Sequence, residues 1–214
     1  MESHEVGQNK VSLIDQNRVF NFSDGVFAFA ATLLVVKIDL PPIIRNDFSH
    51  NLSTAFSVLW PQYLVNIISF IVIGYYWMNH HAILGHVKRY TTIVVWLNIL
   101  FLISIAFLPF PVDLYGDFPT TRFVVVFYSA SLAVSGFMLF FIWLYARSSN
   151  LISASLSESE KNYYTARNLA APIIFTLSIP LVYIDPILTP VSWLLVVICV
   201  IIINRKFRIR EQTM

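Results

Sequence analysis

The stretch TIVVWLNILFLISIAFLPF, residues 92–110, contains no charged side chain. An α-helix needs about 20 mostly apolar residues to cross the hydrocarbon core of a bilayer, so this stretch predicts a membrane-spanning helix. Five similar runs cover residues 19–38, 56–78, 122–145, 169–184 and 188–203. The sequence therefore predicts an all-α, polytopic membrane protein with six transmembrane helices. It divides into an N-terminal segment (1–16), the six-helix domain (17–204) and a basic tail (205–214).

The composition supports this class. Of the 214 residues, 57% are hydrophobic and 12% are charged, whereas roughly 25% are charged in soluble domains. The formal net charge of +2 is too small to predict a nucleic-acid partner. The single cysteine, Cys199, allows no disulfide within one chain.

The basic residues predict the orientation. The turn at Asp185 and Pro186 separates the last two runs, which we expect to form a helical hairpin. Six crossings place both termini on one side. Only three basic residues then fall outside, and the other eleven fall inside with the termini: Lys10, Arg18, Lys88, Arg89, Arg147, Lys161, Arg167, Arg205, Lys206, Arg208 and Arg210. The positive-inside rule predicts cytoplasmic termini in a multi-pass protein of the cell membrane.

The first run carries two ionisable residues near the membrane boundary, Arg18 and Asp24. Such residues are costly in lipid and usually face protein or water. They lie six positions apart, on different faces of a helix, so we expect each to find a partner on another helix. The alternative is a pair that only anchors the helix end at the interface.

Further along this run, Phe29, Leu33 and Val36 share one helical stripe, with Thr32 beside it. Taken alone, such a stripe more often faces lipid or packs in a core. In a symmetric oligomer it would instead form stacked hydrophobic rings around the axis, which can gate a pore by dewetting.

The second run carries a polar line at Gln62, Asn66 and Ser69, which continues toward Trp77 and His80. In lipid, such groups commonly form hydrogen bonds between helices. Asn98 in the third run is a plausible partner.

Metal and catalytic chemistry are not indicated. The spacing of His80, His81 and His86 does not match ligands on one helical face, and no motif of covalent catalysis is present. We therefore expect no metal, no other cofactor and no enzymatic activity. The phrase from Ile73 to Tyr75 lies inside a spanning run without a re-entrant segment, so no filter loop is expected.

Three segments together resemble the transmembrane protein 175 family. They are RVFNFSDGVFA at residues 18–28 leading into TLL at 32–34, YWMNHH at 76–81, and WLN at 96–98 leading to LPFP at 108–111. The resemblance is strong over the first three helices; over the last three it rests on length and hydropathy alone.

The resemblance implies a homotetrameric, potassium-permeable channel in the bilayer, with the first helix lining the pore and no filter loop. It implies a constriction at Phe29, Leu33 and Val36, with Thr32 near the narrow part. It also implies a polar network whose members are Arg18, Ser23, Asp24, either His80 or His81, and Asn98.

The sequence departs from the family pattern at two positions. Phe29 stands where relatives generally carry isoleucine or leucine. Lys37 stands at the outer mouth where an acidic residue is common, with Asp39 nearby as a possible partner. A secondary transporter is the alternative function, although the sequence shows neither midplane charges nor inverted repeats clearly. An intramembrane enzyme and a purely structural scaffold are the remaining alternatives.

Overall fold

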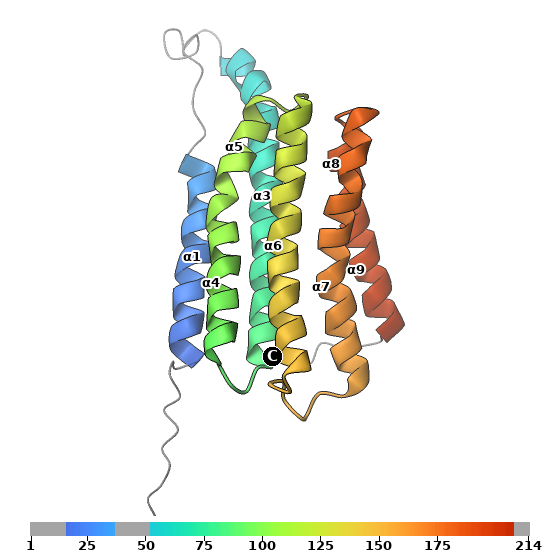
Figure 1. Ribbon diagram of the computed structural model, residues 1–214. Coiled ribbons are helices and arrows are strands. Elements are labelled where there is room, and N and C mark those ends of the chain that lie inside the picture. Colours follow the sequence, from blue (N-terminus) through green and yellow to red (C-terminus); the bar gives the residue numbers. More distant parts are fainter. Residues whose placement is uncertain (1–15, 37–51, 208–214) are drawn as a thin grey trace, which may run out of the picture.

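The computed structural model describes residues 16–36 and 52–207, and all of its regular structure in these ranges is helical (Figure 1). The elements are α1 (Gln16–Val36), α3 (Leu52–Gly85), α4 (Thr92–Phe107), α5 (Pro109–Asp117), α6 (Arg122–Ser148), α7 (Glu158–Ser178), the 3-10 helix η1 (Ile179–Tyr183), α8 (Leu188–Ser192) and α9 (Leu194–Phe207). One isolated bridge, between Val87 and Ile152, is the only strand-like pairing in the described ranges.

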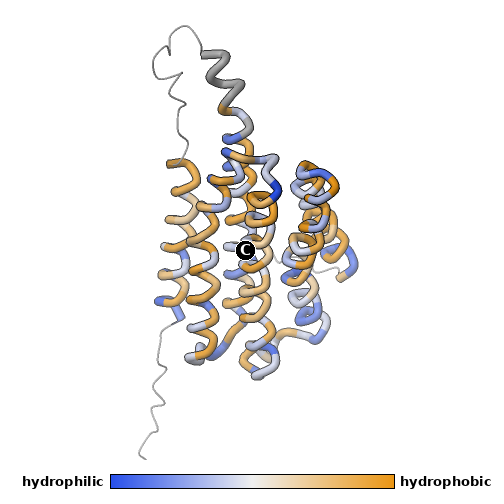
Figure 2. The backbone as a smooth tube through the Cα atoms, turned by 45° about the horizontal axis from the view of Figure 1, so that its top comes forward, coloured by the Kyte–Doolittle hydropathy of each residue, from blue (hydrophilic) through white to orange (hydrophobic). Residues whose placement is uncertain are grey.

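Six helical segments are long and apolar enough to cross a membrane: Gln16–Val36, Gln62–Gly85, Thr92–Asp117, Arg122–Ser148, Glu158–Tyr183 and Leu188–Phe207. This confirms the predicted all-α class and the number of spans. Figure 2 shows hydrophobic residues along the middle of the helices and hydrophilic residues toward their ends.

Three predicted boundaries were wrong. The third span continues through α5 to Asp117 rather than ending at residue 110, because Pro109 occupies the first turn of α5, where a proline fits a helix. The second span ends at Gly85 rather than at residue 78, so His80 and His81 lie within the helix. The fifth begins at Glu158 rather than at residue 169, because Ser157 and Glu160 form a capping box that starts a helix in a polar stretch. Hydropathy alone does not detect a polar first half of a helix.

The helices form one bundle to which a hairpin is attached. α1 packs against α3 and α4, α4 packs against α6, and α6 packs against α7. α7 and α9 contact each other, which confirms the predicted terminal hairpin. The crossing of α6 and α7 is close: a Cβ atom on Gly136 would lie 2.9 Å from Cδ of Pro172.

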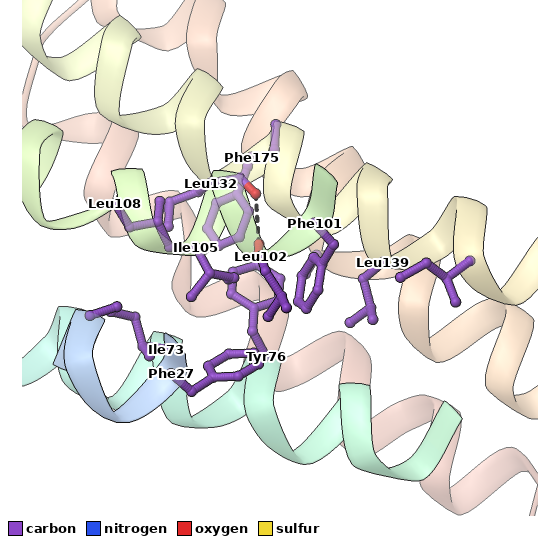
Figure 3. Close-up of a cluster of buried hydrophobic side chains, with 14 of the residues drawn as sticks. Phe27, Ile73, Tyr76, Phe101, Leu102, Ile105, Leu108, Leu132, Leu139 and Phe175 are labelled. Atoms are coloured by element: carbon purple, nitrogen blue, oxygen red, sulfur yellow. Dashed lines mark hydrogen bonds between the residues drawn. The ribbon is translucent and has the colours of Figure 1, made fainter. Parts of the chain in front are cut away.

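The core joins α1, α3, α4 and α6 (Figure 3). Phe101 is fully buried at its centre, with its ring 5.8 Å from that of Phe27 and 6.5 Å from that of Tyr76. The buried Tyr76 hydroxyl donates to the carbonyl of Leu132 at 2.6 Å. This bond satisfies a polar group that would otherwise be costly inside the bundle.

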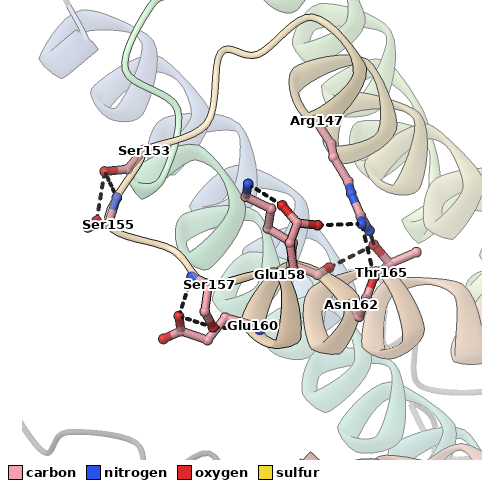
Figure 4. A network of polar contacts seen from close by, with 9 residues as sticks. Arg147, Ser153, Ser155, Ser157, Glu158, Glu160, Asn162 and Thr165 are labelled. Carbon is pink, nitrogen blue, oxygen red and sulfur yellow. Dashed lines mark hydrogen bonds and ion pairs between the residues drawn. The ribbon is translucent and has the colours of Figure 1, made fainter.

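Polar contacts tie α6 to α7 at the end of the bundle where the described chain begins and finishes (Figure 4). Arg147 donates to Glu158 at 3.2 Å, to Asn162 at 2.9 Å and to Thr165 at 2.9 Å. The adjoining loops also pair, with Lys88 donating its backbone N–H to Leu151. We call this end the terminal end.

Candidate functional site

α1 has two opposite faces. Its buried residues, Val19, Ser23, Phe27, Ala30 and Leu34, point into the bundle. The opposite side carries a line of exposed residues spaced alternately by four and three positions: Arg18, Phe22, Gly25, Phe29, Thr32 and Val36. We call this line the outward face of α1. The pattern recurs every seven residues, which is the repeat with which parallel helices pack around a common axis.

The predicted constriction residues lie on or beside this face. The exposed fraction is 61% for Phe29 and 76% for Val36, and Thr32 is exposed between them. Leu33 is half-buried at the margin of the face. Thr32 donates its hydroxyl proton to the carbonyl of Phe29 at 2.8 Å, so its oxygen lone pairs remain able to accept.

Two residues of the outward face, Phe22 and Gly25, were not among the constriction residues predicted from the sequence. Phe22 is 61% exposed, as Phe29 is, and Gly25 leaves open space between the two rings. The signal was available, because Phe22, Phe29 and Val36 are spaced by seven. It was obscured because Phe22 belongs to the FSDG motif, which we had associated with the polar network.

Asp24 is the centre of a first polar cluster. The indole N–H of Trp77 donates to Asp24 Oδ1 at 2.8 Å, and His81 Nε2 lies 2.7 Å from the same oxygen. Since a carboxylate only accepts, the imidazole is the donor in the second contact. The side chains of His81 and Asp24 are 35% and 42% exposed. As expected, Asp24 takes its partners from another helix.

Asn98 is the centre of a second, buried cluster. Its Oδ1 lies 2.7 Å from His80 Nε2, and its amide nitrogen donates to Ser23 Oγ at 3.1 Å. Ser23 in turn donates to the carbonyl of Val19. Each side chain in this cluster therefore donates a hydrogen bond to the next: His80 to Asn98, Asn98 to Ser23, and Ser23 to the backbone of α1. The ring of His80 stacks on Phe101 at 5.3 Å.

The single predicted network is thus two clusters, and each histidine serves one of them. Sequence could not choose between adjacent histidines, because their directions depend on where α1 and α4 lie against α3. Arg18 belongs to neither cluster: it is exposed and has no hydrogen bond or ion pair with another residue in the part of the chain that the structure describes.

Two residues of the polar line of the second span form hydrogen bonds with other helices. Ser69 and Tyr128 share a buried hydrogen bond of 2.8 Å, and Gln62 lies 3.5 Å from Asp117. Asn66 forms no hydrogen bond with the described residues. Lys37 and Asp39, the predicted outer-mouth residues, lie outside the described residues. Within the described ranges, no group of three or more His, Cys, Asp or Glu side chains could hold a metal ion.

Comparison with known proteins covers the helices that carry both clusters. The family model of the endosomal/lysosomal potassium channel TMEM175 matches residues 18–109, which include α1, the second span and α4. Residues 18–109 of this chain are therefore similar to that family. Over most of its length, the chain is also similar to the crystal structure of a lysosomal potassium-selective channel TMEM175 homolog from Chamaesiphon minutus. That match has a TM-score of 0.75 and 27% identity, and covers 88% of this chain and 98% of that one.

The TMEM175 relatives are named as channels. A potassium channel of Chamaesiphon minutus is 29% identical over 192 residues, which cover 88% of this chain and 91% of the relative. A potassium channel of Streptomyces collinus is 38% identical over 104 residues, which cover 49% of each chain. The mouse endosomal/lysosomal proton channel TMEM175 is 37% identical over 101 residues, which cover 45% of this chain and 20% of the mouse protein. The chain therefore matches about half of the Streptomyces relative and a fifth of the mouse protein.

Proposed function

We propose that this chain is a member of the TMEM175 family and a potassium-permeable cation channel that assembles as a homotetramer around the outward face of α1. The exposed repeat of α1 is the observation that carries the proposal. An apolar helix that buries one face in its own bundle and presents a seven-residue repeat on the other is suited to a symmetric axis. Closed homo-oligomers are the common form of soluble assemblies, and we expect the same closure here.

In such an assembly, Phe29 and Val36 form two rings at different depths, and Leu33 narrows the space between them. Hydrophobic rings can close a pore by dewetting. Four copies of Thr32 place acceptor oxygens between the rings, because each hydroxyl proton is already donated to the Phe29 carbonyl. An ion at the level of Thr32 would keep part of its water shell and would exchange only a few of its water ligands for threonine oxygens.

This arrangement predicts modest selectivity. Potassium holds its water less tightly than sodium, so it loses less when a hydrophobic ring strips or distorts the shell. A filter of backbone carbonyls would replace that shell and discriminate more sharply. The polar clusters around Asp24 and Asn98 support this role by fixing the depth and rotation of α1 against α3 and α4.

The proposal also includes the orientation. We place both termini, and hence the terminal end of the bundle, in the cytoplasm, and the chain in the cell membrane, on the positive-inside rule. The segments 1–16 and 205–214 would then be cytoplasmic, with the channel domain between them. Lys37 and Asp39 would lie at the outer mouth.

Proton passage is a second candidate function. The mouse relative is named a proton channel, and the Asp24–His81 pair is partly exposed next to the outward face of α1. A carboxylate hydrogen-bonded to an imidazole can take up and release protons. Substitution of Asp24 by asparagine should then reduce acid-driven proton flux into liposomes more than potassium flux. Equal reduction of both fluxes would reject this second function.

The test of the main function is the reversal potential of the purified protein in a planar bilayer under a potassium–sodium gradient. We expect discrete openings and a shift that favours potassium. Phe29→Ala should increase conductance, whereas Phe123→Ala, which removes a still more exposed ring on α6, should not. A folded oligomer in which neither substitution alters the current would contradict the role of the outward face.

A further inference from the structure

A cavity of about 550 Å³ lies between the bundle and the terminal hairpin, apart from the outward face of α1. Its lining is almost entirely apolar and comes mainly from α3 and α9: Leu64, Val65, Ile68, Ile71, Val72, Tyr75, Leu194, Val196, Val197, Val200 and Ile201. α9 has no buried residue. We call this cavity the α3–α9 groove.

The groove is elongated along the helix axes. On α3, its lining residues Leu64, Ile68, Ile71 and Tyr75 recur at helical spacing. The eleven steps from the first to the last of these residues cover about 16.5 Å along the axis at 1.5 Å per residue. Half of a hydrocarbon core of about 30 Å is nearly the same length. The groove therefore matches the reach of one acyl chain from one leaflet.

Basic residues lie at the end of the groove toward the terminal end. Ile201 lines the groove, and the exposed Arg205 follows one helical turn later on the same face of α9. The exposed Lys206 comes next. The groove residue Tyr75 lies near the guanidinium of Arg167 on α7, within its electrostatic reach.

This end also offers unused hydrogen-bonding capacity. Among the described residues, the buried Asn168 Oδ1 completes no hydrogen bond, and the Tyr75 hydroxyl lies near Asn79 and Arg167. The nearest acidic side chains on α7 are already used, since Glu158 pairs with Arg147 and Lys161, and Glu160 caps the helix at Ser157. The described part of α9 carries no acidic side chain that could pair with Arg205.

We propose that the α3–α9 groove binds an anionic phospholipid, with one acyl chain along α3 and the phosphate near Arg205 and Arg167. The apolar groove is as long as one leaflet is thick, so it would hold an acyl chain of the lipid. The basic side chains at its end would hold the headgroup. Basic pockets between transmembrane helices on the cytoplasmic side are typical sites for anionic headgroups. A second copy of the chain would fit the apolar wall but would not explain the exposed Arg205 at the end of the groove.

The test uses the purified, delipidated full chain. Phosphatidylglycerol or phosphatidylcholine with identical acyl chains is added, and bound lipid is counted by native mass spectrometry. We expect the wild type to retain phosphatidylglycerol in preference to phosphatidylcholine. Arg205→Gln should weaken that binding about fivefold, the effect of one basic residue at an anionic surface. Arg122→Gln, which removes an exposed charge at the opposite end of the bundle, should leave it unchanged.

A second pair of variants tests the groove itself. Val197→Trp fills it and should abolish retention of phosphatidylglycerol, whereas Ile198→Trp enlarges an exposed residue that does not line it and should not. Equal retention of both lipids by the wild type would overturn the proposal. So would normal phosphatidylglycerol binding by Val197→Trp. A change of oligomeric mass in Val197→Trp alone would assign the groove to a contact between copies and would also overturn it.

Discussion

At the scale of single residues, Asn98 joins three helices through two hydrogen bonds. It accepts from His80 on α3 and donates to Ser23 on α1, and all three side chains are buried. Because the bundle interior offers no water to replace a lost partner, this asparagine fixes the contact between α1 and its neighbours.

Asn98→Ala should therefore lower the free energy of unfolding by about 1–3 kcal/mol, since it leaves a buried imidazole N–H and a serine oxygen without their partner. The readout is thermal unfolding in detergent. Asn66→Ala is the matched control, because Asn66 forms no hydrogen bond with the described residues. If both variants melt at the same temperature, the Asn98 cluster does not stabilise the fold.

His86 should make the stability of the fold depend on pH. It lies outside the spans, between α3 and α4, and its Nε2 is 3.0 Å from the Tyr164 hydroxyl. Burial lowers its pKa below the ordinary value of about 6.5, and Glu160 opposes this only in part. The unfolded chain therefore binds the proton more readily. Stability from this group is present above about pH 6.5 and is lost as pH falls toward the lowered pKa.

His86→Gln should flatten this dependence, because glutamine does not titrate. The measurement is the melting temperature from pH 5 to pH 8 for both proteins, and the difference between the two curves removes the contributions of the other histidines. Parallel curves would contradict the prediction.

At the scale of elements, the α6–α7 crossing determines where the terminal hairpin lies. Gly136 and Pro172 allow the two helices to approach closely, and Trp143 and Arg147 on α6 both donate to Thr165 on α7. The hairpin contacts the remainder of the bundle chiefly through α6, so the position of α9 depends on this crossing.

Gly136→Ala should destabilise the protein by about 1–3 kcal/mol, because its new methyl group would press on the rigid ring of Pro172. Gly74→Ala on α3 is the control, since a Cβ there meets nothing within 4 Å. Alanine has the higher helix propensity, so the control should be neutral or stabilising by up to about 1 kcal/mol. Thermal unfolding of both variants measures the difference, and equal melting temperatures would show that the crossing tolerates the methyl group.

At the scale of the whole molecule, hydropathy was sufficient for the number of spans, because each is a long apolar run. It was insufficient for α7, whose polar first half from Glu158 to Asn168 is helical through its capping box and its contacts with Arg147. The rarity of an acid within a span predicted that Asp24 would need a partner on another helix. His81 contacts Asp24 and His80 contacts Asn98 because of how α1, α3 and α4 are rotated against one another. The residues around the two histidines do not reveal that rotation.

The central claim is that the outward face of α1 lines an ion pathway, and thiol accessibility tests it most directly. In a Cys199→Ser background, Thr32→Cys places a thiol on the outward face, and Ala30→Cys places one on the fully buried face of the same helix. A small cationic thiol reagent is applied while potassium current is recorded in a bilayer. We predict that the current through Thr32→Cys channels falls to near zero and that the current through Ala30→Cys channels is unchanged. Conducting Thr32→Cys channels that do not respond to the reagent would contradict the account.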